Sequence, residues 1–345
     1  MKHRILYIFI IILAIVPVAL AGTLPVRRLR SGIILVGKSD TVRAIEPFGG
    51  THGNEKQYAD IVNRYQQEFP MAKVYCMVIP NSAAYYCPDS VASWTRPQHP
   101  AIQSFYGLLS EKVKAVDLYP VLEQHVSEPI YLRTDHHWAP LGAYYAARHF
   151  AEVANVPFMD ISNYDHHVIH NYVGSMYRFS RDISVKQSPE DFVYYTPRDV
   201  KYTTVITPYT LTSDRKSVMS VRESVTCDFF KTFSDGSSAA YCTFMGGDTN
   251  TTSITTSVRN GRRLLILKDS YGNALPAYLL ASFEEIHVVD CRYFTLDMRE
   301  FVKQNGVTDI LFANNIQHAS MLNTSMSYEK YLGQQFKSDK PSAQR

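Results

Sequence analysis

Two kinds of hydrophobic pattern alternate along much of this chain. Short apolar runs, rich in β-branched and aromatic residues, predict buried strands at residues 32–37, 73–80, 115–122, 262–267, 285–290 and 308–312. Apolar residues at helical spacing predict helices over residues 58–69, 102–113, 140–154, 272–283 and 296–305. Pro140 suits the start of its helix because proline is tolerated in the first turn. Alternating strands and helices predict an α/β fold, with a parallel sheet covered on both faces.

The pattern changes between about residues 158 and 258. Thr, Ser and Tyr are frequent there, good helical stretches are few, and residues 191–195 and 200–206 alternate between apolar and polar as strands do. We interpret this segment as a β-rich insertion. The predicted organisation is one α/β domain over residues 22–335, including the insertion, followed by a polar tail at 336–345.

The amino terminus has the pattern of an export signal. Met-Lys-His-Arg precedes an uncharged apolar run at residues 5–20, and Ala19-Leu20-Ala21 matches a small-x-small cleavage site. The run is shorter than the ~20 residues that span a bilayer comfortably, which favours cleavage after Ala21 over retention as a membrane anchor. A buried core helix does not fit, because the run has no polar face. Residues 1–21 therefore predict an extracytoplasmic protein, secreted or anchored at the cell envelope.

Composition narrows the function classes. With 46% hydrophobic residues in 345, most of the chain can bury a core and is not disordered. The 35 basic and 32 acidic residues form no basic stripe, so we expect no nucleic-acid partner. Tyrosine is abundant, with 24 residues, and its apolar ring and hydroxyl suit contact with sugars, although core packing explains most of these residues. The odd number of cysteines, five, leaves at least one free, while Cys227 and Cys242 flank a plausible hairpin turn and are equally compatible with a disulfide or with ordinary thiols.

Ser270 is the candidate nucleophile. It follows the apolar run at residues 264–267 and precedes the small-residue turn Gly272-Asn273-Ala274, where a helix is expected to begin. Its hydroxyl should emerge at the carboxyl edge of the sheet, where open α/β folds bind ligands, close to the positive end of the helix dipole. A simple helix cap by Asp269 or Ser270 is the structural alternative.

Asp135 and His137, within Thr134-Asp135-His136-His137-Trp138, are the candidate partners of the serine. If the carboxylate accepts a hydrogen bond from Nδ1, Nε2 is left as the acceptor that faces the nucleophile. Pro140 places the pair in a turn before a helix, so their side chains need not diverge as they would on a helix. For His136 we favour a packed or surface position.

A metal site is the alternative use of these residues. Asp135-His136-His137 superficially matches the Asp-His-His string of manganese phosphoesterases, and a second string, Asp165-His166-His167, is followed by His170. Those enzymes need further aspartates from an upstream Asp-x-Asp element, which we do not find here. The second string lies in a polar stretch typical of solvent-exposed histidines. We therefore expect no metal and no cofactor.

Several separated motifs, in the same order, resemble the bacterial DHHW protein family over nearly all of the chain after residue 21. They are FGG (48–50), VIPNSAAYY (78–86), RTDHHWAPLGAYYAA (133–147), LLILKDSYGNA (264–274), EEIHVVDCRYF (284–294) and DILFANN (309–315). The family is similar in turn to the alginate O-acetylation proteins, whose SGNH-hydrolase-like domains carry an Asp-x-His element before the Gly-Asp-Ser nucleophile motif. The resemblance implies a three-layer, flavodoxin-like, SGNH-hydrolase-like fold with a permuted motif order.

The resemblance also implies roles for individual residues. Asp135 and His137 match the dyad and Ser270 the nucleophile, although Lys268 stands where the motif has glycine. In SGNH-like enzymes the serine N–H and an asparagine at the end of a later strand bind the oxyanion. At the corresponding position this chain has Asn314 and Asn315. Arg292 and Tyr293 are expected on the same sheet edge, in contact with substrate or in a structural salt bridge.

These features together predict an exported serine esterase or O-acyltransferase, most simply for acetyl, that acts on a cell-surface or extracellular glycan. Its partners would be the glycan and an acyl donor, and the choice between water and a sugar hydroxyl as acceptor separates an esterase from a transferase. The alternative is a glycan-binding or envelope-assembly protein with the same fold and little chemistry, suggested by Lys268 and by the tyrosine-rich middle region.

Overall fold

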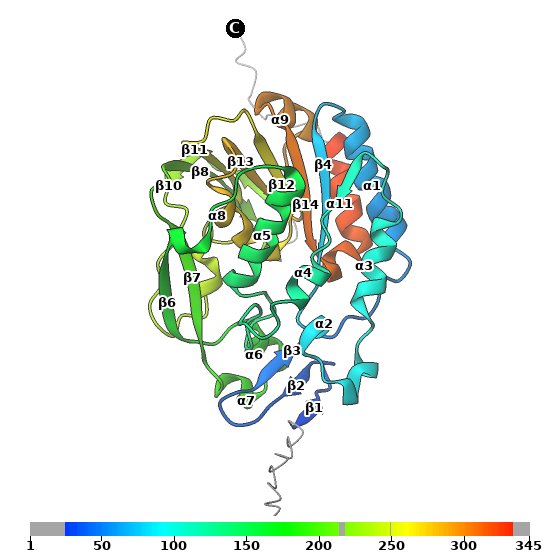
Figure 1. Ribbon diagram of the computed structural model, residues 1–345, viewed down its shortest axis with the longest axis vertical. Coiled ribbons are helices and arrows are strands. Elements are labelled where there is room, and N and C mark those ends of the chain that lie inside the picture. Colours follow the sequence, from blue (N-terminus) through cyan, green and yellow to red (C-terminus); the bar gives the residue numbers. More distant parts are fainter. Residues whose placement is uncertain (1–24, 214–217, 249, 334–345) are drawn as a thin grey trace, which may run out of the picture.

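A mixed nine-stranded sheet forms the centre of the computed structural model, which describes residues 25–213, 218–248 and 250–333. The strand order is β10-β8-β11-β13-β12-β14-β4-β5, with β9 paired to β8 (Figure 1). Five strands run parallel: β4 (Lys73–Ile79), β5 (Val113–Ala115), β12 (Arg263–Lys268), β13 (Glu285–Asp290) and β14 (Asp309–Asn315). Their carboxyl ends therefore meet at one edge of the sheet.

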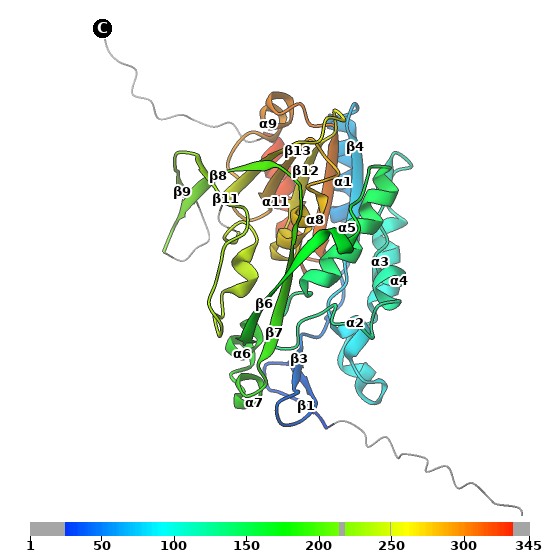
Figure 2. The same cartoon turned by 60° about the vertical axis from the view of Figure 1, so that its left-hand side comes forward.

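The β-rich segment extends this sheet in the antiparallel sense. β11 (Asn250–Thr256) pairs with β13, and β8 (Tyr202–Leu211) pairs with β11. β9 (Val218–Val221) and β10 (Val225–Cys227) both pair with β8. The first part of the segment forms a separate hairpin of β6 (Tyr164–Tyr172) and β7 (Glu190–Pro197), which is seen beside the sheet in Figures 1 and 2.

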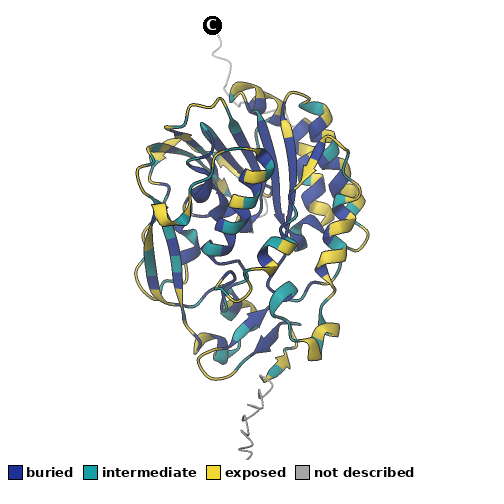
Figure 3. Cartoon of the chain, in the orientation of Figure 1, coloured by how far each residue is buried: buried dark blue, intermediate teal, exposed yellow. Residues whose placement is uncertain are grey.

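Helices cover both faces of the sheet. Tyr75 and Met77 point to one face, where they pack in a core with α4 (Tyr119–Glu123), α5 (Pro140–Ala154) and α8 (Leu275–Leu279). Val74 and Cys76 point to the other face, towards α1 (Glu55–Glu68), α3 (Gln98–Tyr106), α9 (Met298–Gln304) and α11 (Leu322–Gly333). The central strands are accordingly buried, while the outer helices keep an exposed side (Figure 3). This confirms the predicted three-layer α/β architecture.

Smaller elements complete the fold. β1 (Val26–Arg28), β2 (Ile34–Val36) and β3 (Arg43–Ile45) form their own antiparallel sheet, which shares a small core with α6 (Ser175–Ser180) and α7 (Ile183–Lys186). The remaining helices are α2 (Ala83–Tyr86) and α10 (Ile316–Ala319). The 3-10 turns are η1 (Asp89–Trp94), η2 (Ile161–Asn163), η3 (Ala240–Thr243) and η4 (Ser270–Ala274).

Four sequence predictions differ from the fold. The helix predicted at 102–113 is displaced: α3 spans Gln98–Tyr106, and Val113 already belongs to β5. The run at 32–37 does form a strand, β2, but in the small sheet and not in the central one. The strand predicted at 115–122 is wrong: β5 ends at Ala115, and Pro120 lies in the first turn of α4. The helix predicted at 272–283 is shorter and begins as the 3-10 turn η4.

The expected leader at 1–21 and tail at 336–345 lie outside the described residues. Over residues 25–213, 218–248 and 250–333, no helix combines the length and the apolar character that a membrane crossing needs. All five cysteines are free thiols, so Cys227 and Cys242 form no disulfide.

Candidate active site

Two segments far apart in the sequence meet at the carboxyl edge of the sheet. β12 ends at Lys268, and Asp269 caps η4 by accepting a hydrogen bond from the Tyr271 amide at 2.9 Å. Asp269 thus takes the capping role, which leaves the Ser270 hydroxyl free for another partner. The loop that carries Asp135 and His137 comes to the same edge just before α5, after a backbone bridge between Tyr131 and Trp138.

The structure brings Ser270, His137 and Asp135 together in one hydrogen-bonded line. His137 Nε2 lies 2.8 Å from Ser270 Oγ, and His137 Nδ1 lies 2.6 Å from Asp135 Oδ1. Because an ionised carboxylate only accepts hydrogen bonds, Nδ1 carries the proton and Nε2 accepts from the serine hydroxyl. A serine nucleophile activated by a histidine base requires this geometry.

Asp135 is held by four hydrogen bonds. Oδ1 accepts from the amide and the Nδ1 of His137, while Oδ2 accepts from the Tyr172 hydroxyl at 2.8 Å and from the Ser175 amide at 2.7 Å. Burial alone would raise the pKa of Asp135, but His137, His136 and the Ser175 amide outweigh it and hold the pKa well below its usual range. Asp135 is therefore ionised and fixed in orientation.

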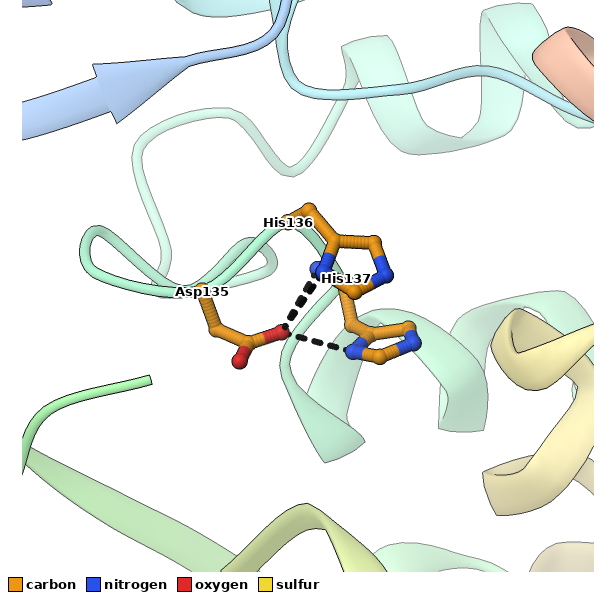
Figure 4. A group of neighbouring side chains, drawn as sticks. All are labelled: Asp135, His136 and His137. Atoms are coloured by element: carbon orange, nitrogen blue, oxygen red, sulfur yellow. Dashed lines mark hydrogen bonds and ion pairs between the residues drawn. The ribbon is translucent and has the colours of Figure 1, made fainter. Parts of the chain in front are cut away.

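His136 completes a compact group with Asp135 and His137 (Figure 4), and within the described residues this group is the one whose ligand atoms lie close enough to hold a metal ion. These atoms already have other partners. Nδ1 of His137 donates to Asp135, and Nδ1 of His136 is hydrogen-bonded to Ser175 Oγ. Burial, followed by repulsion from His137, lowers the pKa of His136 to about 3. His136 is thus a neutral, packed histidine, as the sequence analysis favoured.

The second histidine string lies elsewhere, on β6. Asp165, His166 and His170 are exposed, and His170 Nδ1 contacts Asp191 at 2.9 Å. His167 is half-buried and is hydrogen-bonded to Thr196.

Aromatic rings enclose the imidazole of His137. Tyr241, from η3 in the β-rich segment, stacks on it with ring centroids 3.8 Å apart and an interplanar angle of 5°. His136 lies against it as well, at 3.8 Å and 38°. Trp138 Nε1 donates to the Tyr271 carbonyl and to the Tyr241 hydroxyl. The Trp138 side chain thereby ties the loop of the base to the turn of the nucleophile.

A buried ion network lies beside the nucleophile. Lys268, only 2% exposed, contacts Asp290 at 2.8 Å and Asp248 at 3.5 Å. Arg292 donates two hydrogen bonds of 2.7 Å to Asp290 and lies 2.8 Å from Asp248. Asn273 donates to Asp248 at 2.7 Å. The Lys268 side chain, at the position of the motif glycine, is thus used in this network.

The structure does not support an oxyanion role for the side chains of Asn314 and Asn315, which are completely or almost completely buried. Asn314 Oδ1 accepts from the Tyr58 and Tyr328 hydroxyls, and its amide donates to Asp269. Asn315 donates to the Ile79 carbonyl and caps the Gln317 amide. Both side chains are therefore engaged in holding the sheet edge together. The family resemblance places these asparagines at the end of the strand, but it does not reveal the partners that occupy their side chains.

A cavity of about 670 Å³ opens above the three aligned residues. It is lined by Asp135, His136, His137, Ser270, Asn273, Arg292 and His318, together with residues 172–175, 177–179, 238, 239, 241, 242 and 246–248. Arg292 thus reaches the cavity as expected, whereas Tyr293 is 9% exposed and does not line it. Most of the wall comes from the β-rich segment.

Sequence reasoning missed the residues that support the three aligned side chains. Tyr172, Ser175 and Tyr241 contact Asp135 or His137, and Asp248 anchors the ion network. The sequence offered one weak signal, the Asn171-Tyr172-Val173-Gly174 turn after the second histidine string. Tyr241 and Asp248 carry no local motif.

Comparisons with known proteins give consistent findings. A family model described as DHHW protein matches residues 39–289. A crystal structure of a DHHW family protein from Eubacterium siraeum is 37% identical, with a TM-score of 0.77, over 87% of this chain and 95% of that one. Among curated proteins no match is found.

Two structures of PatB1 from Bacillus cereus, one with a sulfonyl adduct, are also similar. Their TM-scores are 0.63 with the adduct and 0.62 without it, at 17% and 18% identity. Each covers 85% of this chain, and the chain covers 97% and 99% of theirs. At this identity the likeness concerns the fold, and it confirms the SGNH-hydrolase-like architecture.

Proposed function

This chain belongs to the DHHW protein family, and from that premise and the site geometry we propose that it is a serine esterase or O-acyltransferase, most simply for acetyl groups. The observation that carries the proposal is the line of Asp135, His137 and Ser270 beneath an open cavity. A serine hydroxyl that donates to an imidazole oriented by a buried carboxylate is the arrangement of nucleophilic acyl transfer.

In the first step Ser270 Oγ attacks the carbonyl carbon of an ester, and its proton passes to His137 Nε2. The tetrahedral intermediate then collapses: the carbon–oxygen bond to the leaving alcohol breaks, and His137 returns the proton to that oxygen. The product is an acyl-enzyme on Ser270. Asp135, ionised and held by four hydrogen bonds, keeps the imidazole oriented and stabilises the imidazolium between the two transfers.

Water or a sugar hydroxyl then attacks the acyl-enzyme, with His137 as base. Water gives an esterase and a sugar hydroxyl gives a transferase. The open cavity, walled by polar and aromatic side chains, suits an extended polar acceptor, and we propose a glycan of the cell surface or the extracellular space. The apolar run at residues 5–20 behind a basic start supports export to that location.

For the oxyanion we propose the Ser270 amide and Arg292. Nε and Nη2 of Arg292 are hydrogen-bonded to Asp290, which fixes the plane of the guanidinium. Within the described residues, Nη1 has no hydrogen-bond partner, and Arg292 lines the cavity together with Ser270. A fixed cationic donor beside the nucleophile is the kind of group that stabilises a developing negative charge.

The test is turnover of p-nitrophenyl acetate by the purified chain. We expect activity that falls by at least about a thousandfold in Ser270→Ala and in His137→Ala, since the triad acts as a unit. Treatment with phenylmethylsulfonyl fluoride should add one sulfonyl group to Ser270, with loss of fluoride, as seen by peptide mass spectrometry.

Ser253→Ala is a matched control. Ser253 Oγ also lies 3.0 Å from a histidine nitrogen, Nδ1 of His287, but the two residues are simple cross-strand neighbours on β11 and β13. Its removal should leave turnover and sulfonylation unchanged. Equal slow rates in wild type, Ser270→Ala and His137→Ala would refute the enzyme and favour a binding or assembly protein on this fold.

A further inference from the structure

Tyr241 lies flat on the imidazole of His137. The two rings are 3.8 Å apart and nearly parallel, at 5°, and Tyr241 is only 6% exposed. The contact is not local in sequence, since Tyr241 belongs to η3 of the β-rich segment, whereas His137 precedes α5. A buried ring in this position has little freedom to move away from the imidazole.

Two hydrogen bonds fix the Tyr241 hydroxyl. It accepts from Trp138 Nε1 at 3.2 Å and donates to the Tyr271 carbonyl at 3.1 Å. Trp138 directly follows His137, and Tyr271 directly follows Ser270. The phenol is therefore tied to the side chain of the residue after His137 and to the backbone of the residue after Ser270.

A second ring also packs against the imidazole. The His136 ring is 3.8 Å away, and it is uncharged near neutral pH because burial, and then repulsion from His137, lowers its pKa to about 3. With two rings packed against it, the His137 imidazole would meet Tyr241 or His136 on rotating out of its plane. Nε2 thus stays 2.8 Å from Ser270 Oγ while Nδ1 stays 2.6 Å from Asp135.

We propose that Tyr241 is a positioning residue for the acyl transfer described above, on which this inference rests. Its ring holds the imidazole in the plane that joins Asp135 to Ser270, and its π-face attracts the imidazolium that forms when His137 takes the serine proton. Tyr241 makes no bond in the reaction and acts through His137. The β-rich segment thereby contributes to the chemistry as well as to the wall of the cavity.

The experiment compares Tyr241→Phe with Tyr241→Leu by steady-state kinetics on p-nitrophenyl acetate. Phe keeps the ring, and we expect kcat within about threefold of wild type, since only the two hydroxyl hydrogen bonds are lost. Leu removes the ring, and we expect kcat to fall by about tenfold or more, in line with a lost cation–π contact and a looser base. KM should change by less than about twofold, because the interaction strengthens only as the imidazolium forms.

Tyr278→Leu is the matched control for packing. Tyr278 is also buried, lies in the same core on α8, and packs edge-on against Tyr144 and tilted against Tyr164. Its kcat should equal that of wild type. Melting temperatures are measured for each variant, and Tyr241→Met, which fills the space with a flexible chain, replaces Tyr241→Leu if the latter is unfolded at the assay temperature.

Three results would overturn the role of Tyr241 in an active enzyme: wild-type kcat without the ring, an equal loss in Tyr278→Leu, or a loss in Tyr241→Phe as large as in Tyr241→Leu. The last would assign the effect to the hydroxyl. A wild-type chain without Ser270-dependent turnover would overturn the proposed function itself, and this inference with it.

Discussion

Replacing Lys268 by Met tests the buried ion network beside the nucleophile. Lys268 and Arg292 balance Asp290 and Asp248, so the network holds two cations and two anions. Met has a similar length and no charge. The variant therefore leaves one excess negative charge on two aspartates that are largely buried: the Asp290 side chain is 0% exposed and the Asp248 side chain is 25% exposed.

The expected cost follows from this burial. Removing one partner of a buried ion pair destabilises a protein by roughly 3–5 kcal/mol. Asp290 keeps its two hydrogen bonds from Arg292, so we expect the lower end, about 3 kcal/mol. For a domain of this size, an unfolding entropy of about 2.1 cal/mol/K per residue means that each kcal/mol lowers the melting temperature by about 1.5 °C, which gives a shift of about 4–5 °C.

The assay is urea unfolding of the purified chain at neutral pH, followed by circular dichroism. A double variant, Lys268→Met with Asp290→Asn, removes the excess charge and should recover at least half of the loss. Lys303→Met, an exposed lysine on α9, is the control and should change stability by no more than about 0.5 kcal/mol. A cost below about 1 kcal/mol for Lys268→Met, or a double variant as unstable as the single one, would refute the charge-balance argument.

The pH dependence of this cost has a definite sign. Burial alone would lower the pKa of Lys268, but Asp290 and Asp248 outweigh it and raise the pKa. The contribution of Lys268 to the free energy of unfolding is therefore complete below the ordinary lysine pKa, and it is lost as pH rises through the higher pKa of the folded state. Burial alone would raise the pKa of Asp290, but Lys268 and Arg292 outweigh it and lower the pKa. The contribution of Asp290 to the free energy of unfolding is therefore complete above the ordinary aspartate pKa, and it is lost as pH falls through the lower pKa of the folded state. The difference between wild type and Lys268→Met should therefore be constant from about pH 5 to 9 and shrink outside that window.

Three further predictions concern the residues around the nucleophile and its base. In Gly174→Ala the new Cβ would lie 2.3 Å from Asp135 Oδ2, so kcat should fall by about a hundredfold. Gly333→Ala, with open space around it, is the control and should be neutral. Wild-type kcat in Gly174→Ala would contradict the close fit. Tyr172→Phe removes one hydrogen bond to Asp135 and should lower kcat by about three- to tenfold without unfolding the chain, and an unchanged kcat would show that the remaining three bonds suffice. Asn314→Ala leaves the Tyr58 and Tyr328 hydroxyls without their acceptor and should cost about 2 kcal/mol in urea unfolding with kcat nearly unchanged. A large loss of kcat at wild-type stability would instead restore Asn314 as an oxyanion donor.

The layered core was predictable because its strands are continuously apolar. β4, β12, β13 and β14 are buried on both sides, and such runs are readable from sequence as short, β-branched stretches between helical segments. β5 was misjudged because only three residues pair with β4 and the apolar pattern continues into α4. The antiparallel extension of the sheet was hidden by strands of mixed polarity such as β8 and β11, whose partners are set by tertiary contacts.

The aligned Asp135, His137 and Ser270 were predictable because each has a local signal: a two-residue spacing, a turn before Pro140, and a serine at the end of a buried strand. Their supports have no such signal. Tyr172 lies 37 positions after Asp135 (172 − 135), and Tyr241 lies 104 positions after His137 (241 − 137). A tyrosine that holds a carboxylate across such a distance looks in the sequence like any other core tyrosine. Asn314 shows the reverse case, because its place at a strand end fits a donor role while its contacts do not.

Asp135 accepts hydrogen bonds from Tyr172 and Ser175, and Gly174 packs closely against its side chain. All three residues belong to the segment that lines most of the cavity. Under the proposed function, chimeras that exchange the whole segment between relatives would therefore lose activity together with their old specificity. Grafts that begin after Ser175 and retain Tyr241 and Asp248 would keep the catalytic geometry. Under the proposed function, libraries for altered substrate selectivity therefore belong at the remaining wall positions of the cavity.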